Sequence, residues 1–448
     1  MPHALPDLTA ALIDAAMRAG AEAADAVAVE GSSVSIDVRA GALEQAERSE
    51  GIDLGLRVLI GRRQASVSAS DARPETLTEM AERAVAMARE APEDPHAGLA
   101  DPSRLATDLD ASRLELADPA PEPDPQALQQ DALAAEAAAL AVAGVTQVQS
   151  ASAAYGRRVV HLAATNGFSG GYASTSRTTS CVAISGTGTG MERDYDYDSR
   201  SWQADLRDPA EIGAEAGARA AARHGARKPR TGTFPVLFDE RIASSLIGHL
   251  LQAVNGAAVA RGSSWLLGRL GQQVLPKGLS ITEDPHRPRL QGSRLFDGEG
   301  LPTARRDIVA DGVLTGWVLD LATGRKLGMD STANAARGTS APPQPSVSHV
   351  ALTPGTQDRA GLIADMGTGL LVTSLIGSTI NPNTGDYSRG ASGFWVDNGQ
   401  IAHPVNECTI AGNLHDMLLR IVPGNDARPH LSRVVPSILI DGMVLAGA

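Results

Sequence analysis

The sequence predicts an α+β fold in two domains: an N-terminal domain of α/β layers with antiparallel sheets, and a C-terminal β-rich domain that carries a central helix. Three observations lead to this prediction. The chain has 448 residues, which is more than one hydrophobic core usually serves. Helical periodicity and strand-like alternation both occur in the first half, whereas strand-like runs around one amphipathic segment fill the second. A basic, proline-containing stretch at residues 226–230 separates the halves, so we expect domains at 1–230 and 231–448.

The composition indicates a globular protein with an aliphatic core. Apolar residues make up 43% of the chain, but aromatic residues make up only 3%. We therefore expect Val, Leu, Ile and Ala to fill closely packed sheets and helices. The formal net charge of −13 argues against a nucleic-acid-binding surface, because such surfaces rely on clustered Lys and Arg.

The cysteines and the first residues indicate a cytoplasmic chain. Cys181 and Cys408 form neither a CxxC pair nor a cluster with histidine. The start of the chain is amphipathic and lacks the basic region of a signal peptide, and no window approaches about 18 uninterrupted apolar residues. The sequence therefore predicts a reducing compartment and no membrane span.

The first 125 residues predict helix, antiparallel strands and helix, in that order. Asp7 is the expected N-cap of the first helix, and Gly20 is its expected stop. Alternation then predicts four strands, at residues 25–30, 33–39, 51–60 and 62–68. The last two are expected to form a hairpin with its turn at 60–62. Helical periodicity returns at 75–89. Prolines and acidic residues at 90–125 exclude a regular element and indicate an ordered surface crossing or a linker.

The next hundred residues predict two helices, at 126–143 and 209–224, around strands rich in Thr, Ser and Val. The glycines of residues 186–190 imitate a nucleotide-binding loop. No helix with an apolar stripe follows them, so we do not expect a phosphate site there.

Three aspartates in this region, Asp194, Asp196 and Asp198, have the spacing of calcium ligands. The residues after them lack the glycine and the glutamate that a calcium loop needs. We interpret the aspartates as one face of a strand, with Tyr195 and Tyr197 on the other face.

The second half is organised around a short strand at 234–238 that leads through Asp239 into an amphipathic helix. Its apolar residues recur at helical spacing and should face the core: Ile242, Ala243, Leu246, Ile247, Leu250, Leu251 and Val254. A polar strip is expected on the other side, where chemistry could take place: Ser245, Gly248, His249, Gln252 and Asn255.

Beyond this helix the chain predicts more strands. They are expected near 274–282, on both sides of a hairpin turn at 311–312, and in a short piece that ends at 353–355. Prolines 342, 343 and 345 indicate extended chain. Residues 369–405 predict three strands with turns at 381–385 and 397–399, and the chain ends in an apolar strand pair.

Three long runs carry a resemblance to a known family: ARGSSWLLGRLGQQV at 260–274, GDYSRGASGFWVDNG at 385–399 and TIAGNLHDMLLRIVPGND at 409–426. With these runs in this order, the chain resembles the TldD/PmbA family of metallopeptidases, once called modulators of DNA gyrase. The resemblance extends over essentially the whole chain. It is closer to the PmbA (TldE) side of the family than to the TldD side.

The resemblance implies that TldD carries a zinc-peptidase HExxxH sequence on the helix equivalent to the one after Asp239. Counting back without gaps from Arg261-Gly262, the two ligand positions fall here on Ile247 and Gln252, and the glutamate position falls on Gly248. A catalytic zinc needs about three ligands from His, Cys and carboxylates, and a base for its water. Isoleucine, glycine and glutamine supply neither, so we expect no catalytic residue and no metal in this chain.

Six residues are candidates for substrate binding: His249, Asn381, Asp386, Tyr387, Ser388 and Arg389. The last five are expected in a glycine-rich loop between strands. The alternative is structural: the glycines serve tight turns, Asp386 and Arg389 form a local ion pair, and His249 packs or makes a hydrogen bond. Ser388 has no identifiable base, which argues against a serine hydrolase.

For function, the resemblance implies a non-catalytic subunit that pairs with a TldD-like subunit in a hollow heterodimer. The partner would bring the zinc, and the complex would degrade or process unfolded peptides; this chain would be inactive alone and could form a homodimer. The alternative hypothesis is a self-associating peptide- or ligand-binding protein with no proteolytic role. Direct action on DNA is suggested only by the family's former name, and the formal net charge of −13 argues against it.

Overall fold

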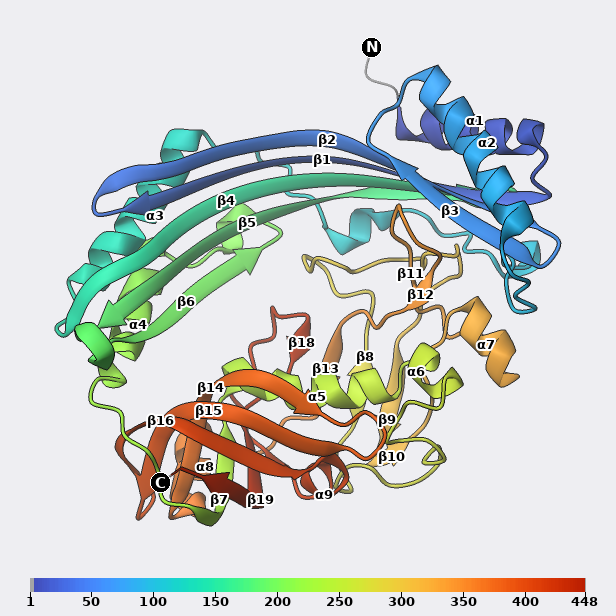
Figure 1. Ribbon diagram of the computed structural model, residues 1–448. Coiled ribbons are helices and arrows are strands. Elements are labelled where there is room, and N and C mark those ends of the chain that lie inside the picture. The colour runs from blue at the N-terminus through green and yellow to red at the C-terminus, as the bar shows by residue number, and fades with distance from the viewer. Residues whose placement is uncertain (1–3, 448) are drawn as a thin grey trace.

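The computed structural model describes residues 4–447 and shows a mixed α+β fold (Figure 1). In the N-terminal half, one sheet of long curved strands arches over the C-terminal half. The helices of this half lie at the two ends of the sheet, α1 and α2 at one end and α3 and α4 at the other. They are α1 (Leu5–Ala19), α2 (Pro74–Glu90), α3 (Pro125–Leu140) and α4 (Pro209–Ala222). The division into domains at residue 230 stays a prediction.

The arched sheet is antiparallel throughout and has the strand order β3-β2-β1-β4-β5-β6. Its strands are β1 (Ala23–Arg39), β2 (Ala42–Ile60), β3 (Arg63–Ala69), β4 (Val145–Ala164), β5 (Ser169–Ser185) and β6 (Glu192–Arg200). The expected hairpin at 60–62 is confirmed, because Ile60 pairs with Arg63.

Two expectations about the first strands are wrong. The expected break at residues 31–32 is absent, because Gly31 pairs with Gly51 on one side and with Arg158 on the other, which carries β1 through the glycine. The second strand begins at Ala42, well before residue 51, although its first residues are exposed and polar. A two-residue turn with positive φ at Ala40 (53°) and Gly41 (73°) starts the pairing immediately after β1.

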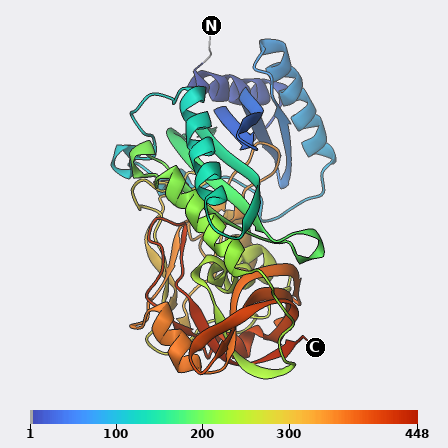
Figure 2. The same cartoon turned by 90° about the vertical axis from the view of Figure 1, so that its left-hand side faces the viewer.

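The helices cover the sheet through alanine and larger aliphatic side chains. The core between α1, α2 and the first strands includes Leu12, Leu54 and Leu56, none of which is exposed. Figure 2 shows α3 and α4 side by side. A Cβ added at Gly213 would lie 1.9 Å from the carbonyl oxygen of Ala135, so only glycine permits this approach. The expected cap Asp7 is wrong: α1 begins at Leu5, and Asp7 lies in its first turn.

The C-terminal half contains a second large sheet with the order β16-β15-β14-β7-β19-β17. Because β16 also pairs with β19, the pairing closes on itself around a large hydrophobic core. Its strands are β7 (Gly232–Phe238), β14 (Gly369–Ile380), β15 (Asp386–Asp397), β16 (Gln400–Asn413), β17 (Val422–Pro423) and β19 (Ile438–Ala446). The helix after β7 is α5 (Glu240–Ala253), which Figure 1 shows on the side that faces the arched sheet.

A third sheet and several short elements complete this half. The order β10-β9-β8-β13-β18 joins β8 (Ile281–Glu283), β9 (Arg306–Ala310), β10 (Val313–Leu314), β13 (Val350–Leu352) and β18 (Arg433–Val434). A small pair joins β11 (Ala335–Ala336) and β12 (Gln344–Pro345). The helices are α6 (Gly256–Ala260), α7 (Leu321–Leu327), α8 (Arg359–Met366) and α9 (Leu414–Leu418).

In this half the hairpin at 311–312 is confirmed, because Ala310 pairs with Val313. The apolar strand pair expected at the end of the chain is wrong. β18 pairs with β13 and β19 pairs with β7, so the two segments belong to different sheets. Each finds a partner far away in sequence, which local alternation cannot reveal.

The stretch at 90–125 is an ordered crossing held by side chains. It contains two short 3₁₀ turns, Pro102–Arg104 and Ala111–Leu114. Leu114 is buried, and Glu115 pairs with Arg289, whose guanidinium lies 3.8 Å from the ring centre of Trp202. Two further 3₁₀ turns are Gly188–Gly190 and Gln203–Asp205. The first is followed by the strand β6 and not by a helix.

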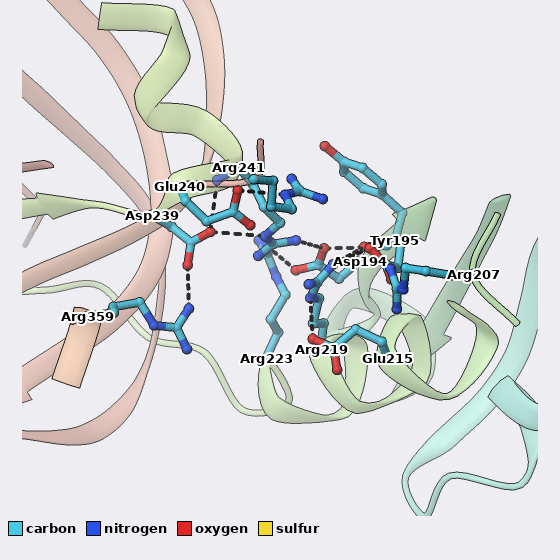
Figure 3. Close-up of polar contacts among 12 residues, drawn as sticks. Asp194, Tyr195, Arg207, Glu215, Arg219, Arg223, Asp239, Glu240, Arg241 and Arg359 are labelled. Atoms are coloured by element: carbon cyan, nitrogen blue, oxygen red, sulfur yellow. Dashed lines mark hydrogen bonds and ion pairs between the residues drawn. The ribbon is translucent and has the colours of Figure 1, made fainter. Parts of the chain in front are cut away.

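Buried ion pairs join the two halves (Figure 3). Asp194 on β6 accepts from Arg241 of α5 at 2.9 Å and from Arg223 at 3.3 Å. Arg241 also bonds Asp239 at 3.2 Å, and Arg223 donates to Ser392 on β15 at 2.6 Å. Burial alone would lower the pKa of Arg241, but the carboxylates of Asp194 and Asp239 raise it above its usual value. The end of α4, the edge strand β6 and the start of α5 are therefore held together by charge.

The aspartates of β6 lie on the inward face of the strand, as interpreted from the sequence. Asp194, Asp196 and Asp198 are buried, whereas Tyr195 and Tyr197 are exposed. Arginines contact these carboxylates: Arg207 and Arg219 each lie 2.8 Å from Asp196, and Arg200 lies 2.9 Å from Asp198.

We expect Asp194→Asn to lower the free energy of unfolding by about 3–5 kcal/mol, because it leaves two buried guanidinium groups without their shared carboxylate. The matched control is Asp330→Asn, which removes a pair with Arg104 in which the aspartate side chain is 89% exposed. That change should cost less than about 1 kcal/mol. Urea titration followed by circular dichroism measures both; equal losses would show that the buried pair does not stabilise the junction.

Candidate functional site

The site is built on α5. β7 carries the chain to Asp239, whose side chain caps the helix by accepting from the backbone N–H of Arg241 at 3.2 Å. Leu246, Ile247 and Leu250 enter the core and fix the orientation of the helix. The remaining side faces the arched sheet.

The polar strip expected on this helix is only partly exposed. Gln252 is exposed and Ser245 is half-buried, but His249 is buried, only 8% exposed. Gly248 is buried as well, because side chains from distant strands cover this part of α5. Asn255 has a structural role: it caps α6 and donates to the carbonyl oxygen of Pro345 at 2.8 Å.

The positions equivalent to the zinc motif do not fit a metal ion. The Ile247 side chain is not exposed at all and belongs to the core, whereas Gln252 lies on the exposed side, so the two positions do not converge. A Cβ added at Gly248 would lie 2.8 Å from Nη1 of Arg433, so a guanidinium occupies the space beside it. No group of three His, Cys, Asp or Glu side chains that could hold a metal ion occurs within residues 4–447. A catalytic zinc needs such donors.

His249 contacts the ring of Tyr387 in an edge-to-face arrangement, with 5.9 Å between the ring centres. Neither ring nitrogen has a hydrogen-bond partner of good geometry in the described part of the chain. Burial lowers the pKa of His249, the positive charges of Arg389 and Arg433 lower it further, and the Gln252 amide opposes part of the shift. The imidazole is therefore held in its neutral form at pH 7.

A cavity of about 440 Å³ opens beside His249 at the C-terminal end of α5. We call it the α5 cavity; its wall is formed by α5, α6 and the turn after β14, through Gln252, Arg261, Ser263, Trp265, Ile380 and Pro382. Its volume lies in the range of small-ligand sites, about 300–1,000 Å³. A second cavity of about 520 Å³ lies at the junction of the halves and includes Ser244, Ser245 and Arg389.

The candidates at 381–389 separate into two groups. Asn381 accepts from the backbone N–H of Asn383, and Asp386 accepts from Thr384 at 2.6 Å, so both stabilise the turn before β15. Tyr387 is buried and lies against His249. The positive charge of Arg389 lowers the pKa of the His249 imidazole. The site therefore contains His249, Tyr387 and Arg389.

Two interpretations of this stretch need correction. Residues 386–389 belong to β15 and not to a loop. The alternative ion pair between Asp386 and Arg389 is absent, because positions three apart on a strand point to opposite faces. Instead, Nε of Arg389 donates to the carbonyl oxygen of Gly377 at 2.7 Å. Ser388 lies on the opposite face from Tyr387 and has no basic side chain bonded to it among the described residues.

Sequence reasoning missed Arg433, which comes from β18 in another sheet. Its only local signal is Gly248 itself. A glycine inside a helix costs about 1 kcal/mol relative to alanine, and it can indicate that another group approaches closely.

The arched sheet, the closed sheet and the helix α5, whose positions 247, 248 and 252 carry Ile, Gly and Gln, together define a metallopeptidase-like fold. Family models match residues 24–88 (PmbA/TldA metallopeptidase domain 1), 118–223 (the central domain) and 231–447 (the C-terminal domain). The chain belongs to the PmbA/TldD metallopeptidase family.

Its similarity to known members extends over nearly the full chain. It is 37% identical to the metalloprotease PmbA of Escherichia coli O157:H7, over 92% of this chain and 90% of that protein. It is 36% identical to a PmbA homologue of Haemophilus influenzae, over 97% and 94%. A crystal structure described as a modulator of DNA gyrase from Bacteroides thetaiotaomicron superposes with a TM-score of 0.90 at 28% identity, over 99% and 98% of the chains. TldE of Thermococcus kodakarensis, at 19% identity, shares the fold with a TM-score of 0.84 over 98% and 100%.

We expect the His249 imidazole to titrate below about 6.5, the ordinary histidine value. Arg433→Gln should move its midpoint upward, because removal of a positive charge makes the imidazolium easier to form. NMR titration of the ring protons measures this, with His249→Gln to assign the signal. Arg83→Gln is the matched control, an exposed arginine on α2 that should leave the midpoint unchanged. A midpoint above the ordinary value in the unaltered protein would contradict the described surroundings of His249.

Proposed function

We propose that the chain is the non-catalytic, PmbA/TldE-like subunit of a TldD/TldE-type zinc metallopeptidase that degrades or processes unfolded peptides in the cytoplasm. The observation that carries this proposal is the helix α5. At its motif positions, Ile247 belongs to the core, Gly248 lies beside a guanidinium, and Gln252 faces a cavity. These residues can neither bind zinc nor activate a water molecule.

The rest of the fold supports a role in binding and assembly. A TldD-like partner would supply the metal and the general base, and this chain would contribute its arched sheet and the α5 cavity to a shared chamber. His249, Tyr387 and Arg389 are the residues we expect to contact the peptide. The cytoplasmic setting is supported by Cys181 and Cys408, which are both free and buried. No helix in the described range 4–447 is long and apolar enough to cross a membrane.

The second candidate is a self-associating peptide- or ligand-binding protein with no proteolytic role. The α5 cavity favours it, because it lies beside a buried imidazole whose nitrogens have no hydrogen-bond partner of good geometry among residues 4–447. Such a cavity can bind a ligand without any catalysis. In that case the homodimer would be the functional form of the protein. It would not depend on the absence of a TldD-like partner.

The direct test is reconstitution. The purified chain alone should contain no stoichiometric zinc and should not cleave an unstructured fluorogenic peptide. Mixed with the TldD-like protein of the same organism, it should give cleavage that exceeds that of either chain alone and that a chelator abolishes. A folded protein serves as the control substrate and should stay intact. Metal-dependent cleavage by this chain alone would refute the proposal.

The alternative makes a different prediction for assembly. If the chain is a subunit, co-purification from cells should recover a TldD-like protein, and adding that protein should convert homodimers into heterodimers in native mass spectrometry. Homodimers that persist in the presence of an excess of the TldD-like protein would favour the self-associating binding protein instead.

A further inference from the structure

Three arginines beside α5 lack a carboxylate partner. Arg261 lines the α5 cavity, Arg433 lies over Gly248, and Nε of Arg389 donates to the backbone carbonyl of Gly377. In the described part of the chain, no Asp or Glu oxygen comes within 4.0 Å of any of them. This contrasts with Arg223 and Arg241 at the nearby junction. They share the carboxylate of Asp194, and each has a further carboxylate partner, Glu192 for Arg223 and Asp239 for Arg241. The region beside α5 is thus locally positive in a chain whose net charge is −13.

The three guanidinium groups lie around His249 on different sides. Arg261 lines the α5 cavity together with His249, and Arg433 lies against the preceding residue, Gly248. Arg389 lies on the same face of β15 as Tyr387, which contacts His249, and it lines the second cavity. The charges of Arg389 and Arg433 both lower the pKa of the imidazole. The three arginines come from different elements, β15, β18 and the end of α6. Their proximity is therefore a product of the tertiary fold and not of local sequence.

Two buried polar groups at this point have no hydrogen-bond partner of good geometry among residues 4–447. They are the imidazole of His249, 8% exposed, and the hydroxyl of Tyr387, 2% exposed. Each can donate one hydrogen bond in its neutral form. Burial raises the pKa of Tyr387 although Arg389 opposes the shift, so the hydroxyl keeps its proton. Buried polar groups are usually satisfied, so an acceptor brought by a ligand would complete both.

We propose that the α5 cavity and the adjoining arginines bind a carboxylate group of the peptide substrate, with Arg433 and Arg389 as the charged partners and His249 and Tyr387 as donors. The proposal rests on the proposed function for its choice of a peptide. The planar guanidinium fork of arginine matches a carboxylate in a bidentate way. The carboxylate comes either from an Asp or Glu side chain or from the C-terminus of the peptide.

Gly248 has a specific role in this proposal. A side chain at this position would displace the Arg433 guanidinium, since even a Cβ would lie only 2.8 Å from Nη1. Gly248→Glu would in addition place a carboxylate next to Arg433. The protein would then supply the anion itself, in competition with the peptide.

Binding to the purified chain tests the proposal without any need for catalysis. Fluorescence anisotropy would compare four labelled unstructured peptides: one with internal Asp residues and a free C-terminus, its Asp→Asn form, its C-terminally amidated form, and the form with both changes. The last peptide should bind at least about tenfold more weakly than the first, as expected for one lost charge-assisted contact. A loss on amidation alone identifies the C-terminal carboxylate, and a loss on Asp→Asn identifies the side chain.

The variants decide which arginines are responsible. Arg433→Gln should weaken binding of the acidic peptide about tenfold and leave the doubly neutral peptide unchanged. Gly248→Glu should also remove the preference. Arg83→Gln, a remote exposed arginine, should change nothing. Arg433 is exposed and makes no ion pair among residues 4–447, so its variant should keep the wild-type melting temperature.

Equal affinity for all four peptides, no binding of any of them, or an unchanged preference in Arg433→Gln would overturn the proposal. These outcomes are independent of the reconstitution test. A complex that cleaves acidic and neutral peptides equally well would leave the subunit role intact and reject carboxylate recognition. A chain that prefers the acidic peptide but never supports cleavage would confirm carboxylate recognition and reject the subunit role.

Discussion

The arrangement of the whole chain depends on one buried carboxylate, Asp194, which lies between Arg223 and Arg241. It is carried by β6, the edge strand of the arched sheet, whereas Arg241 belongs to the first turn of α5 in the other half. A buried charge is tolerated only when it is paired, so these groups must meet for either half to be stable in this arrangement. The contact fixes where α5 lies beneath the arch and therefore which side of the helix can meet a substrate.

A second buried aspartate, again paired with two arginines, joins the two halves at the other end of the arched sheet. Asp25 on β1 is held by Arg57 from the neighbouring strand and by Arg337 from the C-terminal half. Burial would raise the pKa of Asp25, but the two guanidinium groups lower it. Arginine thus has two distinct uses in this protein: it neutralises buried aspartates where the halves join, and it stays unpaired beside α5.

The sequence predicts those features that depend on residues close together in the chain, and it fails for contacts between residues far apart in the chain. The strand, cap and helix from 234 to 253 follow from local periodicity, and the unsuitability of Ile247 and Gln252 for zinc follows from their chemistry alone. Arg389 is among the candidates named from the sequence, but the alternative ion pair between Arg389 and Asp386 is wrong. Their stretch is expected to be a loop, whereas it is a strand, in which these two side chains point to opposite faces. Arg433 could not be placed at all, because β18 reaches α5 only through its pairing with β13, a contact between segments far apart in the chain.

At position 248 this chain has glycine, where the family resemblance implies a glutamate in the zinc-binding subunit. This difference does more than remove a catalytic group. A glutamate there, as the family resemblance implies for the zinc-binding subunit, adds negative charge to a site that must attract a cation. Glycine removes that charge and leaves the space in which the Arg433 guanidinium lies, so the local charge changes from negative to positive. A site of this sign repels a metal ion and attracts the anionic groups of a peptide. Loss of zinc chemistry and gain of carboxylate affinity would then be two consequences of the same small residue.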